Sequence, residues 1–317
     1  NLNNLCQIFL VIKHGSLGDI SQISGVLKVI KETYNDKKIF ILTTLPYVEL
    51  LSKCPYINGV LIDKRLPRWN ILYLIKLKKL LGKFDFSYVY DLQNSPRTSF
   101  YRRFLLNITN WSSAETILKK GEKKRDFDNE SVLERFKIQL EHSNVKTNNT
   151  LKPDFSWAAD NVDKIVNKYF GKKFVLLFPF CSPNLQHKKW PYFNDLIKII
   201  KTKHPNIEIA ITPGPNEMED AKKIKAISIT NQDKILNIME LAGLVKKASY
   251  VIANDTGPAH MAAHLGKMGI VLFGHHTSAK KVSIETDKFK AITAEKLTDL
   301  TAEKVYFEIK EKLESIN

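Results

Sequence analysis

The sequence predicts an α/β protein of two domains, each with a parallel sheet covered by helices on both faces. Short segments that are apolar throughout alternate with segments whose apolar residues recur at helical spacing, as in successive strand–helix–strand units. This alternation starts again after the polar, turn-rich residues 142–153, which are the best candidate for a linker. A chain of 317 residues is long for one domain and long enough for two hydrophobic cores.

The first half contains four apolar segments with the length of buried strands. We expect strands at residues 7–12, 38–42, 59–62 and 86–90. Helical spacing is found at residues 20–32, 47–53 and 69–81. Parallel strands need such crossovers between them, so the first half predicts one parallel sheet.

The second half repeats the pattern. We expect strands at residues 174–178, 207–211, 250–253 and 270–273. Helices are expected at residues 160–169, 191–202, 216–226, 238–246, 258–265 and 301–314. The resulting domains are residues 1–150 and 151–300, followed by a C-terminal helical segment, 301–317.

Composition indicates a globular chain, with 44% hydrophobic and 26% charged residues and no apolar run long enough to span a bilayer. The first residues, NLNN, carry no basic charge, so we expect a buried first strand and no signal peptide. The cysteines Cys6, Cys54 and Cys181 are far apart and odd in number, which favours reduced thiols in a cytosolic protein.

The net charge of +16 favours phosphate-bearing partners such as a nucleic acid, an anionic membrane or a phosphorylated substrate. Residues 64–103 hold ten Lys and Arg against two acids. This stretch has two interpretations, a lysine-rich solvated surface or a binding surface. Arg65, Arg68 and Arg97 favour the second, because the guanidinium fork suits phosphate and carboxylate groups.

The first candidate site, residues 14–19 (HGSLGD), directly follows the first strand. Gly15 and Gly18 allow a tight turn that brings backbone N–H groups close to a ligand. Asp19 then lies at the start of the first helix, at the carboxyl edge of the sheet where α/β proteins bind ligands. The alternative is that Asp19 only caps this helix.

The second candidate site, residues 254–260 (NDTGPAH), lies between a predicted strand and helix. Gly257 permits close backbone approach, and a helix N-terminus beside the hydroxyl of Thr256 suits a pyrophosphate. An ordinary capped helix is the alternative. The third candidate, residues 187–191 (HKKWP), is either a basic loop or a lysine-bearing loop over the same edge. No metal-ligand spacing is present.

Taken in order, these sites resemble glycosyltransferase family 9, the ADP-heptose:lipopolysaccharide heptosyltransferases, from the first strand to about Gly274. Residues 254–274 (NDTGPAHMAAHLGKMGIVLFG) are similar to the family's D-T-G-x-x-H-x-A-A-x-x-G block and its F-G strand end. The family's K-x-G-x-x-G-D matches Lys13, Gly15, Gly18 and Asp19, and its K-x-W-P matches Lys188, Trp190 and Pro191. Residues 91–97 (DLQNSPR) are a looser match.

The resemblance implies a GT-B fold, two Rossmann-like domains that face a cleft, with the C-terminal helix packing back on the first domain. It implies an inverting, metal-independent transfer of heptose from ADP-heptose to an inner-core sugar of lipopolysaccharide, without a cofactor. Asp19 is then the base, and Lys188 stabilises the departing diphosphate. The nucleotide-binding residues implied are Lys188, Glu217, Leu236, Asp255, Thr256, Gly257 and His260. The acceptor-binding residues implied are Gly15, Ser16, Gly18, Arg65, Arg68 and Arg97.

The resemblance further implies a cytoplasmic enzyme, peripheral at the cytoplasmic face of the inner membrane. The sequence departs from the family at Phe180, where small residues are usual, and residues 109–125 match no part of the pattern. A family 9 transferase with another nucleotide sugar or glycan acceptor is therefore a second hypothesis. A third is a non-enzymatic binder of nucleic acid or membrane, but no nucleic-acid motif is present and such a binder does not need Asp19.

Overall fold

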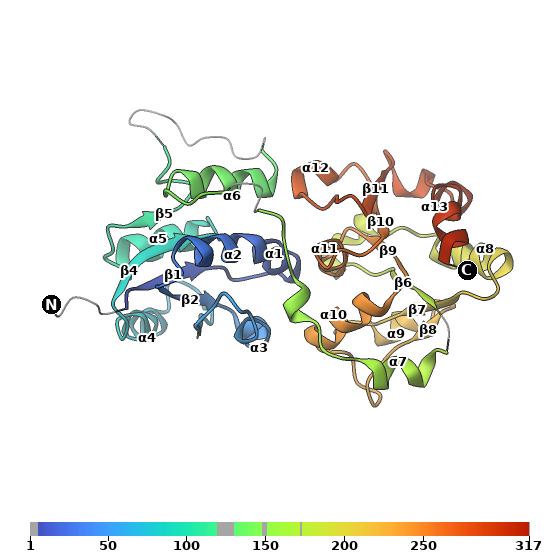
Figure 1. The fold of residues 1–317 in the computed structure, drawn as a ribbon, viewed down its shortest axis with the longest axis horizontal. Helices are drawn as coiled ribbons and strands as arrows, with labels where there is room; N and C mark the ends of the chain where they lie inside the picture. Colours follow the sequence, from blue (N-terminus) through green and yellow to red (C-terminus); the bar gives the residue numbers. More distant parts are fainter. Residues whose placement is uncertain (1–5, 119–129, 148–150, 172, 317) are drawn as a thin grey trace. The chain divides into compact units, whose positions relative to one another are not determined.

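The computed structural model describes residues 6–118, 130–147, 151–171 and 173–316 (Figure 1). The chain divides into two compact units, Asn1–Pro153 and Asp154–Asn317, and each contains one sheet of parallel strands. The α/β class with two parallel sheets, predicted from the sequence, is confirmed. Residues 148–150 of the expected linker and residues 119–125 of the unmatched stretch lie outside the described residues.

The first sheet has the strand order β3-β2-β1-β4-β5, with helices between successive strands. Its strands are β1 (Ile8–Ile12), β2 (Lys38–Thr43), β3 (Gly59–Ile62), β4 (Phe86–Asp91) and β5 (Trp111–Ser112). The helices are α1 (Leu17–Gln22), α2 (Ser24–Thr33), α3 (Val48–Ser52), α4 (Ile71–Leu81), α5 (Pro96–Phe104) and α6 (Val132–Glu141), with a 3-10 turn, η1 (Leu45–Tyr47). The strand order reverses between β1 and β4, and open α/β sheets bind ligands at the carboxyl ends of such neighbours.

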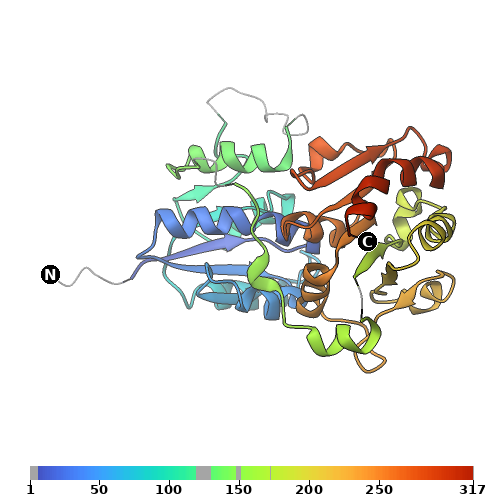
Figure 2. The ribbon, with the colours of Figure 1, turned by 45° about the vertical axis from the view of Figure 1, so that its right-hand side comes forward.

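Helices cover both faces of the first sheet. On one face, Tyr73 and Leu77 of α4 and Tyr101 of α5 pack with Leu10 and Ile12 of β1 in a single buried cluster. Figure 1 shows α2 in front of the strands, and Figure 2 shows the same layers turned by 45°. Because successive strand residues point to opposite faces, β1 is apolar throughout and contributes to the packing on both sides.

The second sheet has the order β11-β10-β9-β6-β7-β8 and reverses between β6 and β9. Its strands are β6 (Phe174–Phe178), β7 (Glu208–Ile211), β8 (Ile227–Ser228), β9 (Tyr250–Asn254), β10 (Gly269–Phe273) and β11 (Phe289–Thr293). Its helices are α7 (Asp163–Tyr169), α8 (Phe193–Lys203), α9 (Met218–Ala221), α10 (Ile238–Lys247), α11 (Gly257–His264), α12 (Ala279–Val282) and α13 (Ala302–Ile316). The 3-10 turns are η3 (Ser156–Ala158), η4 (Pro183–Lys188) and η5 (Leu297–Asp299).

The C-terminal helix differs from its expectation. Its apolar face, Val305, Ile309 and Leu313, is fully buried in the core of the second unit, together with Ile197 and Ile200 of α8. These positions recur every four residues, so they form the one apolar stripe of α13, and α8 in its own unit covers that stripe. The expectation that α13 buries this face on the first domain is therefore wrong.

Several other elements also differ from the prediction. Helix α9 is much shorter than the predicted residues 216–226. The sequence patterns did not predict the helices α5, α6 and α12 or the strands β5, β8 and β11. The missed strands are three of the four outer strands of the two sheets, where fewer neighbours demand a continuous apolar run. The other strands, including the central ones that position the candidate sites, match their predictions within one residue at each end.

Candidate active site

The four motifs singled out in the sequence lie where the two strand orders reverse. Residues 13–19 follow β1, and residues 91–97 span the end of β4, its neighbour in the first sheet. In the second sheet, the loop after β6 carries residues 187–191, and residues 254–260 span the end of its neighbour β9. Each unit therefore brings two of the motifs together at the carboxyl edge of its own sheet.

Asp19 occupies the third position of helix α1. Its Oδ2 accepts hydrogen bonds from the backbone N–H of Ser16, at 2.9 Å, and from the Ser16 hydroxyl, at 3.3 Å. Ser16 is the N-cap of α1, and Asp19 closes a capping box with it. The structural alternative had expected Asp19 itself to be the cap. Among the described residues no donor reaches Oδ1, and the carboxylate is only partly buried, so it is oriented with one oxygen available.

The side chains of Lys13 and Asp91 also lie at this edge of the first sheet. Lys13 is buried and donates to the carbonyl oxygen of Leu92 at 3.3 Å. Burial lowers the pKa of Lys13, while the nearby carboxylates Asp19 and Asp91 raise it. Burial raises the pKa of Asp91 to about 6, against the hydrogen bonds of the Thr98 hydroxyl and nearby backbone N–H groups. The loops after β1 and β4 thus share one electrostatic environment.

A buried carboxylate that the sequence analysis missed supports this edge. Asp63, directly after β3, bonds to Nε2 of His14 at 2.7 Å and accepts from the Tyr101 hydroxyl at 2.5 Å. It also accepts from the Tyr73 hydroxyl and from the backbone N–H of Arg65. Burial favours a higher pKa for Asp63, but the hydrogen bonds from His14 and the two tyrosines lower it to about 2. The sequence signal that could have identified Asp63 is its position directly after a strand, at the carboxyl edge of the sheet.

The three arginines predicted for the acceptor take different positions around this cluster. Arg97 donates to the Tyr101 hydroxyl at 3.3 Å. Arg68 donates to the carbonyl of Pro96 at 3.5 Å and lies over the Phe100 ring, 5.7 Å from its centroid. Arg65 is exposed and contributes its backbone N–H to the cluster.

A cavity of about 340 Å³ lies beside these residues, at the end of β4 and the start of α5. Arg68 and Asp91 line it together with Arg103, which the sequence analysis left unassigned. The cavity walls combine guanidinium groups with the aromatic rings of Phe100 and Phe104. Because Glu115 also lines the cavity, it presents two carboxylates as well as two guanidinium groups beside an apolar surface.

In the second unit, Asp255 is the centre of a charged cluster. Its Oδ2 lies 3.2 Å from Nζ of Lys188 and 3.0 Å from Nε2 of His276, and its Oδ1 lies 3.8 Å from Nε2 of His260. Asp255 is 6% exposed, so these contacts are well shielded from water. The carboxylate holds the lysine in place at the sheet edge. His276 was not predicted, because it comes from the loop after β10.

Asn254 fixes the loop that carries Lys188. Its side-chain oxygen accepts from the backbone N–H of Trp190 at 3.1 Å, and its amide donates to the carbonyl of Phe180 at 3.4 Å. The indole N–H of Trp190 donates to the carbonyl of Leu300 at 2.7 Å. The side chain of Phe180 is itself buried in the hydrophobic core of the second unit.

Helix α11 begins beside Asp255, with Thr256 as its N-cap and Gly257 as its first residue. The Thr256 hydroxyl makes no capping hydrogen bond and lies 3.4 Å from the carbonyl of Asn254. The first N–H groups of a helix carry partial positive charge and lack partners within the helix. This end of α11 is therefore suited to bind phosphate oxygens, with Lys188 adding a full charge.

Glu217 and Leu236 lie in the loops that follow the next strands of the second sheet, β7 and β8. Glu217 accepts from the backbone N–H of Gly214 at 2.7 Å and is only partly buried. Burial raises its pKa, against this hydrogen bond. Leu236 is 9% exposed and packs as a core residue. In the described part of the chain, neither residue forms a hydrogen bond or ion pair with Asp255.

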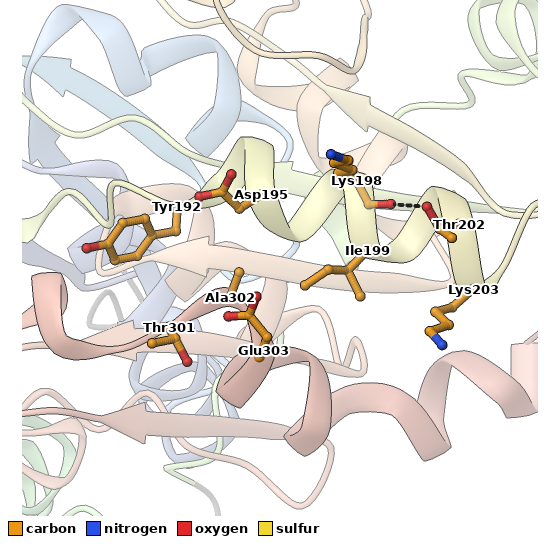
Figure 3. Close-up of a pocket in the computed structure, with 9 residues that line it drawn as sticks. All are labelled: Tyr192, Asp195, Lys198, Ile199, Thr202, Lys203, Thr301, Ala302 and Glu303. Carbon is orange, nitrogen blue, oxygen red and sulfur yellow. Dashed lines mark hydrogen bonds between the residues drawn. The ribbon is translucent and has the colours of Figure 1, made fainter.

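Other features bear on the expected chemistry. The cysteines Cys6, Cys54 and Cys181 are free. Within residues 6–118, 130–147, 151–171 and 173–316, no cluster of three potential ligand side chains could hold a metal ion. In the same residues, no helix is long and apolar enough to cross a membrane. A cavity of about 610 Å³ between α8 and α13 (Figure 3) is lined by none of the predicted site residues.

The chain also matches a known protein family. Residues 74–304 fit the model of glycosyltransferase family 9 (heptosyltransferase). The chain is 25% identical to the lipopolysaccharide core heptosyltransferase OpsX of Haemophilus influenzae, over 84% of this chain and 78% of that protein. It is 27% identical to lipopolysaccharide heptosyltransferase 1 of Campylobacter coli, over 91% of this chain and 90% of that protein.

Solved structures share the fold. The Escherichia coli heptosyltransferase WaaC with ADP has a TM-score of 0.75 at 16% identity, covering 96% of this chain and all of WaaC (100%). The E. coli ADP-heptose LPS heptosyltransferase II has a TM-score of 0.74 at 16% identity, covering 98% of this chain and 99% of that one. The predicted GT-B fold is thus confirmed.

Proposed function

Because this chain belongs to glycosyltransferase family 9, the heptosyltransferase family, we propose that it transfers heptose from ADP-heptose to an inner-core sugar of lipopolysaccharide. Family membership makes it a glycosyltransferase, and the relatives support the donor and acceptor. OpsX is a lipopolysaccharide core heptosyltransferase, and WaaC has been solved with ADP and with ADP-2-deoxy-2-fluoro heptose. The observation that carries the proposal is the cluster of Lys188 and Asp255 at the start of α11.

In the proposed reaction an acceptor hydroxyl oxygen attacks the anomeric carbon of the heptose from the side opposite ADP. The bond from that carbon to the diphosphate oxygen breaks, so the configuration inverts and ADP leaves with the electron pair. Asp19 takes the hydroxyl proton through Oδ1, while Ser16 keeps Oδ2 engaged and the carboxylate oriented. Gly15, Ser16 and Gly18 would shape the backbone around the acceptor.

The diphosphate gains negative charge as it leaves, and the second unit offers positive charge in compensation. Lys188, held by Asp255, and the N–H groups of Thr256 and Gly257 would bind its oxygens. His260, on the first turn of α11, would support the same phosphate or the loop around it. These groups supply the charge that a metal ion supplies in metal-dependent transferases, which supports a metal-independent reaction.

We assign the nucleoside to the outer part of the same edge. Glu217 would accept hydrogen bonds from ribose hydroxyls, since its second carboxylate oxygen accepts none from the described residues. Leu236 would pack against the adenine ring, although a side chain 9% exposed offers only a small contact. We further propose that the enzyme acts at the cytoplasmic face of the inner membrane, where the acceptor is anchored.

A family 9 transferase with a different donor or acceptor is the competing hypothesis, and ligand protection against thermal unfolding separates the two. Under our proposal ADP and ADP-sugars raise the melting temperature, while UDP, GDP and their sugars do not. A transfer assay with ADP-heptose and heptose-deficient lipopolysaccharide then tests the sugar and the acceptor. Protection by UDP or GDP alone would favour the competing hypothesis.

Removal of the lysine amine should weaken nucleotide binding. We expect Lys188→Ala to raise the Kd for ADP by about 10- to 100-fold, because a charge-assisted contact contributes roughly 1.5–3 kcal/mol. Isothermal titration calorimetry measures this directly. The matched control is Lys198→Ala in α8, which lines the cavity of Figure 3 and makes no ion pair with Asp255. ADP affinity equal to that of the wild type would reject the role of Lys188.

Charge reversal at the arginines should weaken acceptor binding. We expect Arg65→Glu, Arg68→Glu and Arg97→Glu each to raise the acceptor KM and to leave ADP affinity unchanged, because inner-core acceptors carry carboxylates and phosphates. Steady-state kinetics with varied acceptor provides the measurement. Lys83→Glu is the control, because Lys83 follows the far end of α4. An unchanged KM in all three variants would mean that this basic stretch is only surface.

A further inference from the structure

Helix α4 and the segment before it expose an unusual concentration of large apolar side chains. Trp69 is 80% exposed, Leu72 is 72% exposed and Ile71 is 67% exposed. Ile75 and Leu66 are also exposed. Of the large hydrophobic side chains exposed in the described parts of the chain, most lie between residues 62 and 75. Isolated exposed apolar residues are ordinary, but a contiguous group of them marks an interaction surface.

The apolar groups on α4 form a second face of the helix. Tyr73, Leu77 and Leu81 point into the core of the first unit, where they pack on the sheet. Ile71 and Ile75 are one turn apart and stay outside that core. A surface helix normally presents polar residues there, so folding of this unit does not account for the outer apolar face.

Positive charge surrounds this outer face. Lys64, Lys76 and Lys79 are exposed, and residues 64–83 contain no acidic residue. A cavity of about 410 Å³ runs along the surface and is lined by Leu66 and Leu72 together with Lys64 and Lys76. Apolar side chains therefore lie directly beside lysine amines, which suits a partner with apolar and anionic parts side by side.

We propose that this surface docks the enzyme on a bilayer that contains anionic phospholipid. The docking surface consists of Leu66, Trp69, Ile71, Leu72, Ile75, Lys64, Lys76 and Lys79. Its tryptophan and aliphatic side chains enter the boundary between headgroups and acyl chains, and its lysines bind the phosphate groups. The inference does not depend on the proposed reaction, because none of these residues belongs to the candidate active site.

Vesicle co-sedimentation of the full chain tests the docking surface. We expect binding to vesicles of phosphatidylcholine and phosphatidylglycerol. Binding to vesicles of phosphatidylcholine alone should be at least about tenfold weaker. Added salt should weaken the first interaction. The variant Trp69→Ser/Leu72→Gln/Ile75→Gln and the variant Lys76→Glu/Lys79→Glu should each reduce binding at least about tenfold.

Matched controls use exposed residues elsewhere in the chain. Phe307→Ser removes a side chain that is 69% exposed on α13, and Lys288→Glu/Lys290→Glu reverses two exposed lysines around β11. Both should bind vesicles like the wild type. Because Trp69 is exposed, Trp69→Ser alone should keep the melting temperature and serves as the apolar test where the triple variant does not fold.

The fluorescence of the Trp69 indole provides a second measurement of docking. The wild-type emission should shift to shorter wavelength when anionic vesicles are added, and Trp69→Phe should lose that shift while it still binds. Transfer to a deacylated, water-soluble acceptor should be unchanged in all docking variants, which separates failure of this inference from failure of the proposed function. Wild-type levels of vesicle binding in the docking variants would overturn the inference. The inference would also be overturned if the protein formed a dimer in the absence of vesicles and the docking variants dissociated that dimer.

Discussion

We expect Asp19→Asn to lower the turnover number by about 10²- to 10⁴-fold and to leave the fold and both binding steps intact. The amide of asparagine has nearly the shape of the carboxylate, and its oxygen can still accept hydrogen bonds from Ser16. It cannot accept the proton of the acceptor hydroxyl. Loss of the base therefore affects the chemical step and not the capping box.

The structural alternative makes a different prediction for the same variant. If Asp19 only closes the capping box of α1, Asn costs at most about 1 kcal/mol of stability and turnover stays near normal. Ser16→Ala is the matched control, because it removes the hydroxyl contact to Asp19 and keeps the carboxylate. It should lower stability slightly and turnover far less than Asp19→Asn does.

Turnover measured with saturating ADP-heptose separates the two roles, provided that the melting temperature and the ADP affinity are measured on the same preparations. A stable Asp19→Asn protein that binds ADP and turns over at close to the wild-type rate would refute the base role. The proposed mechanism would then need another proton acceptor, and Asp91, with a pKa raised to about 6, would be the next residue to test.

The sequence predicted the central strands well because their side chains are buried on both sides, as in the run FVLLF of β6. Helix α5 was missed because its sequence, PRTSFYRRF, is polar and has no clear apolar stripe. Local interactions define it instead. Pro96 occupies its first turn, Ser95 caps it, and Tyr101 anchors its buried side to Asp63.

The candidate site, like the fold, was predicted from the sequence only in part. Glycines and capping residues next to strands identified the loops around Asp19 and Asp255, because these signals are local in the sequence. The ion pair between Lys188 and Asp255 joins residues 67 positions apart, and His276 comes from a further loop. Such contacts depend on strand order, and the spacing of residues along the chain does not contain that order.

The buried cluster around Asp63 leads to the prediction with the largest effect on stability. We expect Asp63→Ala to lower the free energy of unfolding of the first unit by about 3–5 kcal/mol. The substitution leaves His14 and the hydroxyls of Tyr73 and Tyr101 buried without their carboxylate partner. Unpaired polar groups in a low-dielectric core are costly.

The pH dependence of this contribution follows from the lowered pKa. The ordinary pKa of an aspartate is near 3.8, and that of Asp63 in the folded protein is about 2. A depressed folded pKa stabilises the fold fully above the unfolded value, so about 2 kcal/mol is present above pH 4 and disappears as the pH falls toward 2. Asp63→Asn, which cannot ionise, should lack this pH dependence.

Hydrogen exchange followed by mass spectrometry measures the stability of the first unit alone, through the amides of β1 and β4. The control is Asp36→Ala, which removes an exposed aspartate paired with Lys37 and should leave exchange nearly unchanged. In Asp63→Ala the β1 amides should exchange faster at neutral pH, and turnover should fall as well, because His14 begins the loop that carries Asp19. Protection equal to that of the wild type would mean that Asp63 does not hold this edge of the sheet together.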